Sequence, residues 1–336
     1  MIRRALAALI LLALTGALVA IVWPQLFTLQ RTTPVAQAVS LRGAAVILGL
    51  VAAVLGTVLA LLIRPGRRFL AMVAVLLLGF TGIQVTVLST RGIAGTGFET
   101  DSEATLTVLS WNTLGDAPGV EAIADLVLER RPDIVALPET TEETAKQVAA
   151  AAQAAGLPLV SYTVAYDQIS KARSTSLLIS ADLGSYVIGS GASNTAVLPS
   201  VVAVPAGGGP KIVAAHAVAP TTAYTPEWRS DLAWLAAQCA SEDVILAGDF
   251  NATLDHFSGL QAAPGADLGQ CRDAGRLGGG GAIGTWPTSL PALVGTPIDH
   301  VLATPSWRVS GYRVITDRDG AGSDHRPVLV QLTRAG

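Results

Sequence analysis

The pattern of apolar and polar residues changes abruptly about a quarter of the way along the chain. Three long, nearly uninterrupted apolar runs occupy residues 5–23, 43–63 and 69–88. Each is close to the roughly 20 residues that an α-helix needs to cross a bilayer. We therefore expect residues 1–91 to form a membrane module of three transmembrane helices. The first run alone would also fit a signal peptide, but its length and the two runs that follow favour three spans.

The arginines that flank these runs predict how the module is oriented. The N-terminus and the second loop carry five arginines, and the opposite side carries three: Arg3, Arg4, Arg64, Arg67 and Arg68 against Arg31, Arg42 and Arg91. Basic residues are enriched in cytoplasmic loops. Three crossings would then place the remainder of the chain outside the cell. We expect a multi-pass protein of the cell membrane with an extracytoplasmic domain.

After a Gly- and Thr-rich linker at 92–105, short apolar stretches alternate with Gly, Pro and polar residues. Alternation and β-branched content predict strands at 106–112, 133–139, 159–165, 176–180, 186–188, 200–204, 211–216, 243–249, 297–302, 308–315 and 327–333. Helical spacing occurs at 119–131, 141–155 and 225–238. Strands outnumber helices, and helices fall between some of them. This order predicts an α/β fold for residues 106–336, with two packed sheets flanked by helices.

Charge separates the two parts as clearly as hydropathy does. Residues 1–90 contain seven arginines and no other charged residue, whereas residues 91–336 contain 15 basic and 25 acidic residues, a net charge of −10. An acidic domain argues against a grip along a nucleic-acid backbone, which depends on phosphate neutralisation by Lys and Arg. Cys239 and Cys271 both fall in the expected external domain. They could form a disulfide or remain two separate buried thiols, and their spacing does not suggest zinc.

Six of the predicted strands have polar groups at or just beyond one end. These groups are Asn112, Glu139, His216, Asp249 with Asn251, Asp299 with His300, and Asp324 with His325. Strands that share a sheet edge bring such residues together, and buried polar groups need partners. Carboxylate oxygens suit Mg²⁺, with Mn²⁺ or Ca²⁺ as alternatives, while zinc would prefer more His or Cys. Together with two histidines able to move protons, the set predicts metal-assisted attack of water on a phosphoester.

Five motifs carry a resemblance to a known family. They are Trp111-Asn112, Pro138-Glu139, Gly248-Asp249-Phe250-Asn251, Ile298-Asp299-His300 and Ser323-Asp324-His325-Arg326-Pro327. In this order, over residues 106–332, they resemble the endonuclease/exonuclease/phosphatase superfamily, which includes deoxyribonucleases, abasic-site endonucleases, bacterial sphingomyelinases and inositol polyphosphate 5-phosphatases. The resemblance implies a four-layered α/β sandwich of two mainly antiparallel sheets, and a divalent-metal phosphodiesterase or phosphatase. We expect a membrane-anchored bacterial member.

The resemblance also implies roles for the metal-site residues. Glu139 would be the principal metal ligand, with Asn112 beside it. Asp324 would be a further carboxylate of the metal site. Many members have Gln before the metal-binding Glu, where this chain has Pro138.

Five further residues take catalytic roles by the same resemblance. Asp249 would position or deprotonate the attacking water, and Asn251 would hold the scissile phosphate. His325 would contact the phosphate and stabilise developing charge, oriented by Asp299. His216 matches a second histidine of the deoxyribonuclease and sphingomyelinase branches.

Other residues are assigned less sharply. The acidic or tyrosine residue that the family carries in mid-domain has no clear match, and Tyr166, Asp167 and Arg173 are the nearest candidates. We expect His300 to be structural behind Asp299 and His256 to be solvated. Trp286 fits either a substrate cleft or the core.

The expected function is hydrolysis of a lipid headgroup or a small phosphoester at the outer face of the membrane. An extracellular or membrane-tethered endonuclease is the alternative, disfavoured by the acidic charge. A non-catalytic binding module is a further alternative, but the presence of Glu139, Asp249 and His325 argues against it. The physiological substrate, the preferred ion and the oligomeric state do not follow from the sequence.

Overall fold

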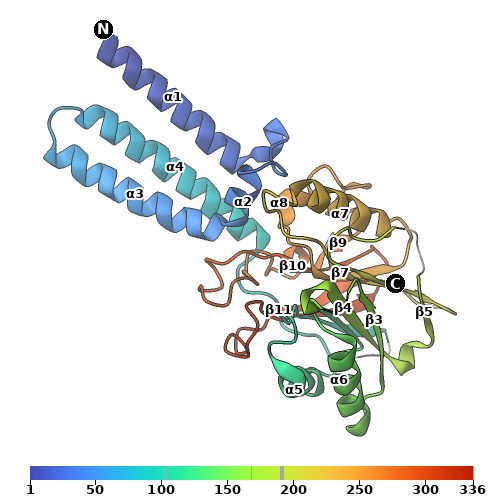
Figure 1. Cartoon of the computed structure of the whole chain (residues 1–336). Helices are drawn as coiled ribbons and strands as arrows, with labels where there is room; N and C mark the ends of the chain where they lie inside the picture. The colour runs from blue at the N-terminus through green and yellow to red at the C-terminus, as the bar shows by residue number, and fades with distance from the viewer. Residues whose placement is uncertain (101, 103, 168, 190–192, 336) are drawn as a thin grey trace. The chain divides into compact units, whose positions relative to one another are not determined.

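The structure is a computed structural model that describes all residues except 101, 103, 168, 190–192 and 336. The chain divides into two compact units, Met1–Thr90 and Arg91–Gly336. Unit 1 is built on three long helices, α1 (Ile2–Val22), α3 (Arg42–Leu62) and α4 (Arg67–Arg91) (Figure 1). Each is long and apolar enough to cross a membrane, and each overlaps a predicted apolar run.

Close packing and one buried cation hold unit 1 together. A Cβ added at Gly49 of α3 would lie 2.5 Å from Thr81 Oγ1 of α4, so the glycine permits a close approach of the two helices. The buried Arg42 guanidinium donates to Gln84 Oε1 on α4 and to Val22 O at the end of α1. A 3₁₀ helix, η1 (Pro24–Phe27), and a short helix, α2 (Val35–Ser40), lie between α1 and α3. One arginine thus links all three long helices.

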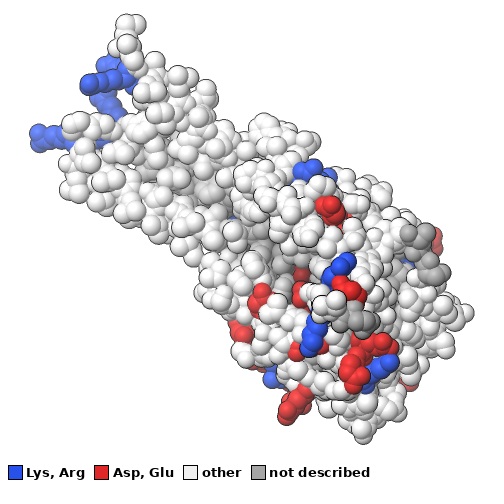
Figure 2. Space-filling model, viewed as in Figure 1, with Lys and Arg blue, Asp and Glu red and all other residues white. Residues whose placement is uncertain are grey.

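The charged side chains are distributed differently in the two units. Figure 2 shows basic side chains of unit 1 gathered at the end that carries the N-terminus and the α3–α4 turn. On the visible face of unit 2, acidic and basic side chains are intermixed, and no continuous basic stripe is seen. This face therefore offers no long electropositive track of the kind that follows a nucleic-acid backbone.

Unit 2 contains two six-stranded sheets. The first has the order β11-β12-β1-β2-β4-β3 and the second the order β5-β6-β7-β8-β10-β9. The strands of the first sheet are β1 (Thr105–Ser110), β2 (Ile134–Pro138), β3 (Leu159–Ala165), β4 (Ser174–Ser180), β11 (Trp307–Val314) and β12 (Val328–Arg334). Those of the second are β5 (Tyr186–Ile188), β6 (Val201–Pro205), β7 (Lys211–His216), β8 (Val244–Asp249), β9 (Arg272–Asp273) and β10 (Asp299–Ala303). Pairing is antiparallel except between β1 and β2 and between β7 and β8.

The alternation of side chains along the strands creates two hydrophobic layers. Val108 of β1 packs between the sheets, whereas its neighbour Leu109 packs on the outer side. That outer layer is covered by α5 (Gly119–Arg130) and α6 (Glu142–Ala154). Helix α7 (Thr225–Gln238) lies over the second sheet (Figure 1). The arrangement of helices, sheet, sheet and helix confirms the predicted α/β sandwich.

Cys239 and Cys271 are joined by a disulfide, and both are fully buried. Of the two alternatives left open by the sequence, the structure therefore shows the disulfide. The bond connects the C-terminal end of α7 to the residue before β9, across a sequence separation of 32.

The prediction that His256 is solvated is wrong, because the side chain is completely buried. It belongs to a four-residue helix, α8 (Leu254–Phe257), and its Nδ1 accepts the N–H of Thr253 at 2.8 Å. Its ring packs edge-on against Trp228, with 5.0 Å between ring centroids. Helices α8 and α9 (Ala274–Leu277) and the two-residue strand β9 are too short to show a hydrophobic period, so the sequence did not predict them.

Candidate functional site

Strand register brings the predicted polar residues to one edge of the sandwich. In the second sheet, Asp249 pairs with His216 across β7–β8 and with Asp299 across β8–β10. In the first sheet, β1 runs parallel to β2 and antiparallel to β12. The segment that follows β1 and holds Asn112 therefore lies at the same edge as the segment that precedes β12 and holds His325. Neighbouring strands lie about 4.8 Å apart, so registered partners are close enough to interact.

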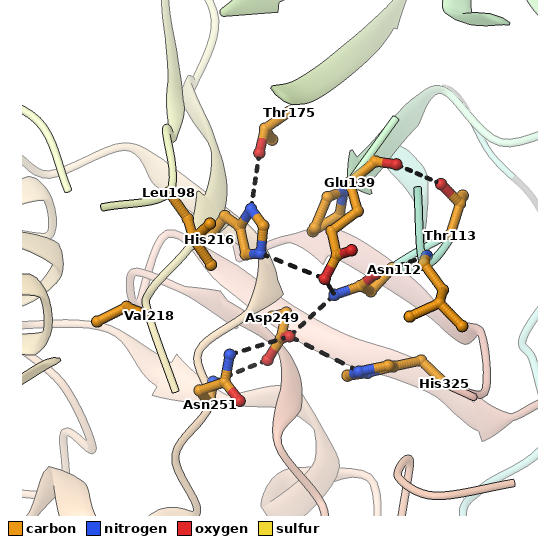
Figure 3. A network of polar contacts seen from close by, with 12 residues as sticks. Asn112, Thr113, Glu139, Thr175, Leu198, His216, Val218, Asp249, Asn251 and His325 are labelled. Atoms are coloured by element: carbon orange, nitrogen blue, oxygen red, sulfur yellow. Dashed lines mark hydrogen bonds and ion pairs between the residues drawn. The ribbon is translucent and has the colours of Figure 1, made fainter. Parts of the chain in front are cut away.

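Asn112 connects the two sheets through its side-chain amide. Its Nδ2 donates to Glu139 Oε1 at 3.1 Å and to Asp249 Oδ2 at 3.0 Å (Figure 3). Its Oδ1 accepts the backbone N–H of Leu114 at 2.9 Å, which fixes the orientation of the amide. Asn112 therefore aligns one carboxylate from each half of the sandwich. The amide oxygen, which is the atom that would bind a metal, already accepts the N–H of Leu114. The role of Asn112 as a metal ligand therefore stays a prediction.

His325 lies among three carboxylates. Its Nδ1 is 2.9 Å from Asp299 Oδ2, and its Nε2 is 3.8 Å from Asp249 Oδ2 and 3.9 Å from Asp324 Oδ1. Burial disfavours the cation, but the negative charges of Asp299, Asp249 and Asp324 outweigh it and raise the pKa of His325 to about 10. The imidazole is therefore a cation at neutral pH.

Asp249 is the carboxylate shared by most of this network. Burial raises the pKa of Asp249, and the charge of Asp299 raises it further, while His325 and hydrogen bonds from Asn251 and Asn112 lower it. Asn251 donates its backbone N–H to Asp249 Oδ1 at 2.8 Å and its Nδ2 to Asp249 Oδ2 at 3.2 Å. The same Nδ2 also donates to Ala217 O at 2.9 Å, which fixes the side chain of Asn251. The fixed side chain in turn orients Asp249. Contact between Asn251 and a phosphate stays a prediction.

His216 is a neutral, fully buried histidine beside Glu139. Its Nδ1 is 3.1 Å from Thr175 Oγ1, and its Nε2 is 3.9 Å from Glu139 Oε1. Burial lowers the pKa of His216 to about 3, and the cationic His325 contributes to this shift. Among the described residues, Nε2 has no hydrogen-bond partner, so the atom is available to a ligand.

The backbone around the site is held in an unusual conformation. Of the six non-glycine residues with positive φ among the described residues, four lie here: Leu114, Asp116, Glu139 and Asn251. Such conformations cost on the order of 1–3 kcal/mol each and persist only where surrounding contacts enforce them. Asp116 supplies such contacts, because its N–H donates to Glu139 O and its carboxylate accepts the N–H of Thr141. These strained positions gave no signal in the sequence.

Asp324 and Trp286 form a contact that the sequence did not predict. The indole Nε1 of Trp286 donates to Asp324 Oδ2 at 2.8 Å. The other oxygen, Oδ1, is buried without a hydrogen-bond partner among the described residues. Trp286, which the sequence left between cleft and core, thus orients a carboxylate predicted for the metal site.

His300 is structural, as predicted. Its Nδ1 lies 2.7 Å from Asp273 Oδ2, and its Nε2 lies 2.8 Å from Ala252 O. Both ring nitrogens are therefore engaged within the fold. The mid-domain candidates are occupied as well: Tyr166 donates its hydroxyl to Thr195 O, and Asp167 forms an ion pair with Arg173.

The site fits a divalent cation in two ways. Asp249, Asp299 and His325 present ligand atoms within 4.8 Å of one another, so this group could hold a metal ion. Glu139 and Asp324 offer hard carboxylate oxygens, one of which, Asp324 Oδ1, accepts no hydrogen bond from the described residues. Burial raises the pKa of Glu139; the hydrogen bond from Asn112 and the charge of His325 lower it, while the charges of Asp324 and Asp299 raise it. A bound cation would relieve this crowding of negative charge.

Two facing mixed sheets with helices outside, and a polar edge built from carboxylates, amides and histidines, have the architecture of the deoxyribonuclease-I-like fold. A family model described as the Endonuclease/Exonuclease/phosphatase family matches residues 109–325. The chain belongs to this family, whose members typically hydrolyse phosphoesters.

Solved structures share this fold at low sequence identity. An endonuclease/exonuclease/phosphatase from Beutenbergia cavernae has a TM-score of 0.51 and 20% identity, covering 70% of this chain and 72% of that one. TDP2 of D. rerio, in complex with a single-strand DNA product, has a TM-score of 0.52 and 16% identity, covering 69% of this chain and 100% of that one. A family member from Bacteroides vulgatus has a TM-score of 0.50 and 15% identity, with coverage of 69% and 100%. No curated protein sequence matches the chain.

Proposed function

We propose that this protein is a divalent-metal-dependent phosphoester hydrolase acting at the outer face of a membrane on a lipid headgroup or a small phosphoester. The observation that carries the proposal is the position of His325 between Asp299 and Asp249. The same Asp249 is joined through Asn112 to Glu139. A cation, a carboxylate of raised pKa and hard oxygen ligands are thereby concentrated at one edge of the sandwich.

Asp249 is the proposed base. Its raised pKa makes it a stronger proton acceptor than an ordinary aspartate, and its two hydrogen bonds from Asn251 fix the direction of its oxygens. It would take a proton from the attacking water. Asn251 would also contact the scissile phosphate.

Two histidines of opposite character would contact the phosphate. His325, held as a cation by Asp299, would stabilise the negative charge that grows in the transition state. His216 is neutral, and its Nε2, which has no hydrogen-bond partner among the described residues, would offer a hydrogen bond to a phosphoryl oxygen. One supplies charge and the other supplies orientation.

Glu139 and Asp324, with Asn112 beside them, would hold the cation, and Mg²⁺ is the first choice, with Mn²⁺ or Ca²⁺ as alternatives. The group of Asp249, Asp299 and His325 is the alternative site, and it would require a neutral His325, because a protonated imidazole has no free lone pair. A bound divalent cation supplies Lewis-acid stabilisation of phosphoryl charge. The chain's own residues orient the ligands: Asn112 donates to Glu139, and Trp286 donates to Asp324.

Charge and hydropathy support the substrate class. The net charge of −10 over residues 91–336 opposes the binding of an extended polyanion such as nucleic acid. A small molecule with a single phosphoester would contact only the residues of the site. Three helices able to span a membrane would hold the domain near lipid. The arginine count favours the outer face. DNA is the second substrate to test, because the D. rerio neighbour was solved with a DNA product.

The test is an assay of the full-length protein in detergent with bis-p-nitrophenyl phosphate and p-nitrophenyl phosphate. We expect turnover that requires Mg²⁺, Mn²⁺ or Ca²⁺ and stops with a chelator. His325→Ala should keep Mn²⁺ binding but lower kcat by about 10²-fold or more. No turnover with any of the three ions by folded protein would overturn the enzyme assignment. Sphingomyelin vesicles and plasmid DNA, assayed in parallel, separate the lipid from the nuclease alternative.

Protease treatment of intact cells tests the location. An outward domain would be cleaved without permeabilisation. Protection until permeabilisation would contradict the proposed orientation and leave the chemistry untouched.

A further inference from the structure

Arg326 follows the site histidine directly, and its long side chain is buried at 2% exposure. Its guanidinium forms a two-point ion pair with Asp319, with Nε–Oδ1 at 2.8 Å and Nη2–Oδ2 at 2.7 Å. The same group donates to four backbone carbonyls of segment 284–290: Gly284 at 3.1 Å, Pro287 at 3.3 Å, Thr288 at 3.2 Å and Leu290 at 2.7 Å. Every N–H of the guanidinium therefore has an acceptor.

Segment 284–290 in turn contacts two acidic residues of the site, Asp299 through its backbone and Asp324 through both its side chain and its backbone. Thr285 Oγ1 accepts the backbone N–H of Asp299 at 3.1 Å, at the start of β10. Trp286 Nε1 donates to the side chain of Asp324, and the N–H of Thr288 donates to the backbone carbonyl of Asp324 at 2.9 Å. The segment thus holds the carboxylate predicted to bind metal, and it fixes the backbone of the residue that orients His325.

We propose that Arg326 is a positioning residue that fixes segment 284–290, and through it the side chain of Asp324 and the backbone of Asp299. The effect that we expect on catalysis rests on the proposed function. The planar guanidinium suits the task, because it can satisfy a carboxylate and several carbonyls at once in a rigid geometry. Lysine has only three donors, on a flexible stem, and would leave some of the buried carbonyls without partners.

The test compares Arg326→Lys with Arg276→Lys. Arg276 is a matched control, because it also forms a two-point pair with a carboxylate, that of Asp267, and donates to the carbonyl of Gly265. In Arg326→Lys we expect kcat to fall by about 10- to 100-fold with KM changed less than about threefold, and Mn²⁺ affinity to fall by about 10-fold. Hydrogen exchange in segment 284–290 should rise. Arg276→Lys should leave all four quantities within about twofold of wild type.

Trp286→Phe tests the path, since it keeps an aromatic ring but removes the N–H that reaches Asp324. If Arg326 acts through Trp286, the loss of Mn²⁺ affinity in the double variant should be smaller than the product of the two single losses. Normal Mn²⁺ affinity and kcat in a folded Arg326→Lys variant would overturn the proposal, and so would a fully multiplicative double variant. If Arg326→Lys does not fold, Asp319→Asn, which weakens the anchor, should show a smaller loss of the same kind, and unchanged Mn²⁺ affinity there would overturn it.

Failure of the proposed function has a different signature. If the wild-type protein hydrolyses no phosphoester, the enzyme assignment fails, but Mn²⁺ affinity and hydrogen exchange still decide the role of Arg326. If the wild type is active and these two readouts do not respond to Arg326→Lys, only the positioning role fails.

Discussion

Replacing Asp299 by Asn tests the charge pairing on which the proposed chemistry depends. The substitution keeps the size of the side chain but removes its charge. In the structure, Asp299 Oδ2 lies 2.9 Å from His325 Nδ1, and the carboxylate is almost fully buried. Its neighbour Thr285 bonds to the backbone N–H of Asp299, so this contact should survive the substitution. The variant therefore perturbs the electrostatics of His325 more than its position.

The size of the effect follows from the separation of the charges. Two unit charges about 4 Å apart interact by about 4 kcal/mol at an effective dielectric constant near 20. One pKa unit corresponds to about 1.36 kcal/mol, so the loss of Asp299 should lower the pKa of His325 by about 3 units. The wild-type pKa is about 10, which keeps the cation through pH 9. The variant should lose the cation as the pH rises through about 7.

The assay is kcat for bis-p-nitrophenyl phosphate between pH 5.5 and 10. In Asp299→Asn we expect the decline of kcat at high pH to begin about 3 units lower than in wild type, so the loss is larger at pH 9 than at pH 6. Asp273→Asn is the control, because Asp273 pairs with the structural His300 and not with His325. A uniform loss of rate, with the same pH profile as wild type, would refute the pairing of Asp299 with a cationic His325.

Three further predictions concern the metal site and the stability of unit 2. Glu139→Ala should lower Mn²⁺ affinity and kcat together, each by at least about 10-fold; electron paramagnetic resonance of Mn²⁺ measures the former, and unchanged affinity would contradict the ligand role. Burial disfavours cationic His300, but Asp273 outweighs it and raises the pKa of His300, so this pair stabilises the fold below about pH 6.5 and the contribution is lost as pH rises through the folded-state pKa. Wild type should therefore lose more unfolding free energy than His300→Gln between pH 6 and 9 in urea titrations; parallel losses would argue against the pair. Replacing Cys239 and Cys271 by Ser should cost about 3–4 kcal/mol in the same titrations, given the 32-residue separation, and a cost below about 1 kcal/mol would count against it.

The elements that the sequence predicted best are those bounded by clear local signals. Strand β7 and helix α7 have the predicted bounds, because the turn Gly207-Gly208-Gly209-Pro210 precedes the strand and Pro226 lies in the first turn of the helix. Helix α8 was missed because its four residues are held by the Thr253–His256 capping contacts and by Trp228, neither of which is visible as periodicity. Local pattern therefore predicts the framework, and tertiary contacts decide the short elements that complete it.

The same distinction applies to the site. Polar residues after apolar strands were expected to converge, and they do, because β1 and β2, like β7 and β8, end at a common edge. The choice of partners was not predictable. Asn112 reaches Asp249, 137 residues away and on the other sheet. Trp286 reaches Asp324 across a loop whose path depends on the buried Arg326.

Glu139 and Asn251 were predicted as site residues from their motifs, but their backbone conformation was not predicted from the sequence. A positive φ, 56° at Glu139 and 46° at Asn251, is normally accommodated by glycine, and glycine would have marked the turn. Here the side chains themselves are needed, so the backbone strain has to be offset by surrounding contacts such as the bond from Asp116 N–H to Glu139 O. Local preference and chemical need conflict at Glu139, whereas asparagine adopts a positive φ more readily than most residues. Backbone conformations that surrounding contacts enforce against the local preference of the residue occur mainly at functional sites. Glu139 and Asn251 both carry side chains that are proposed to act in phosphoester cleavage.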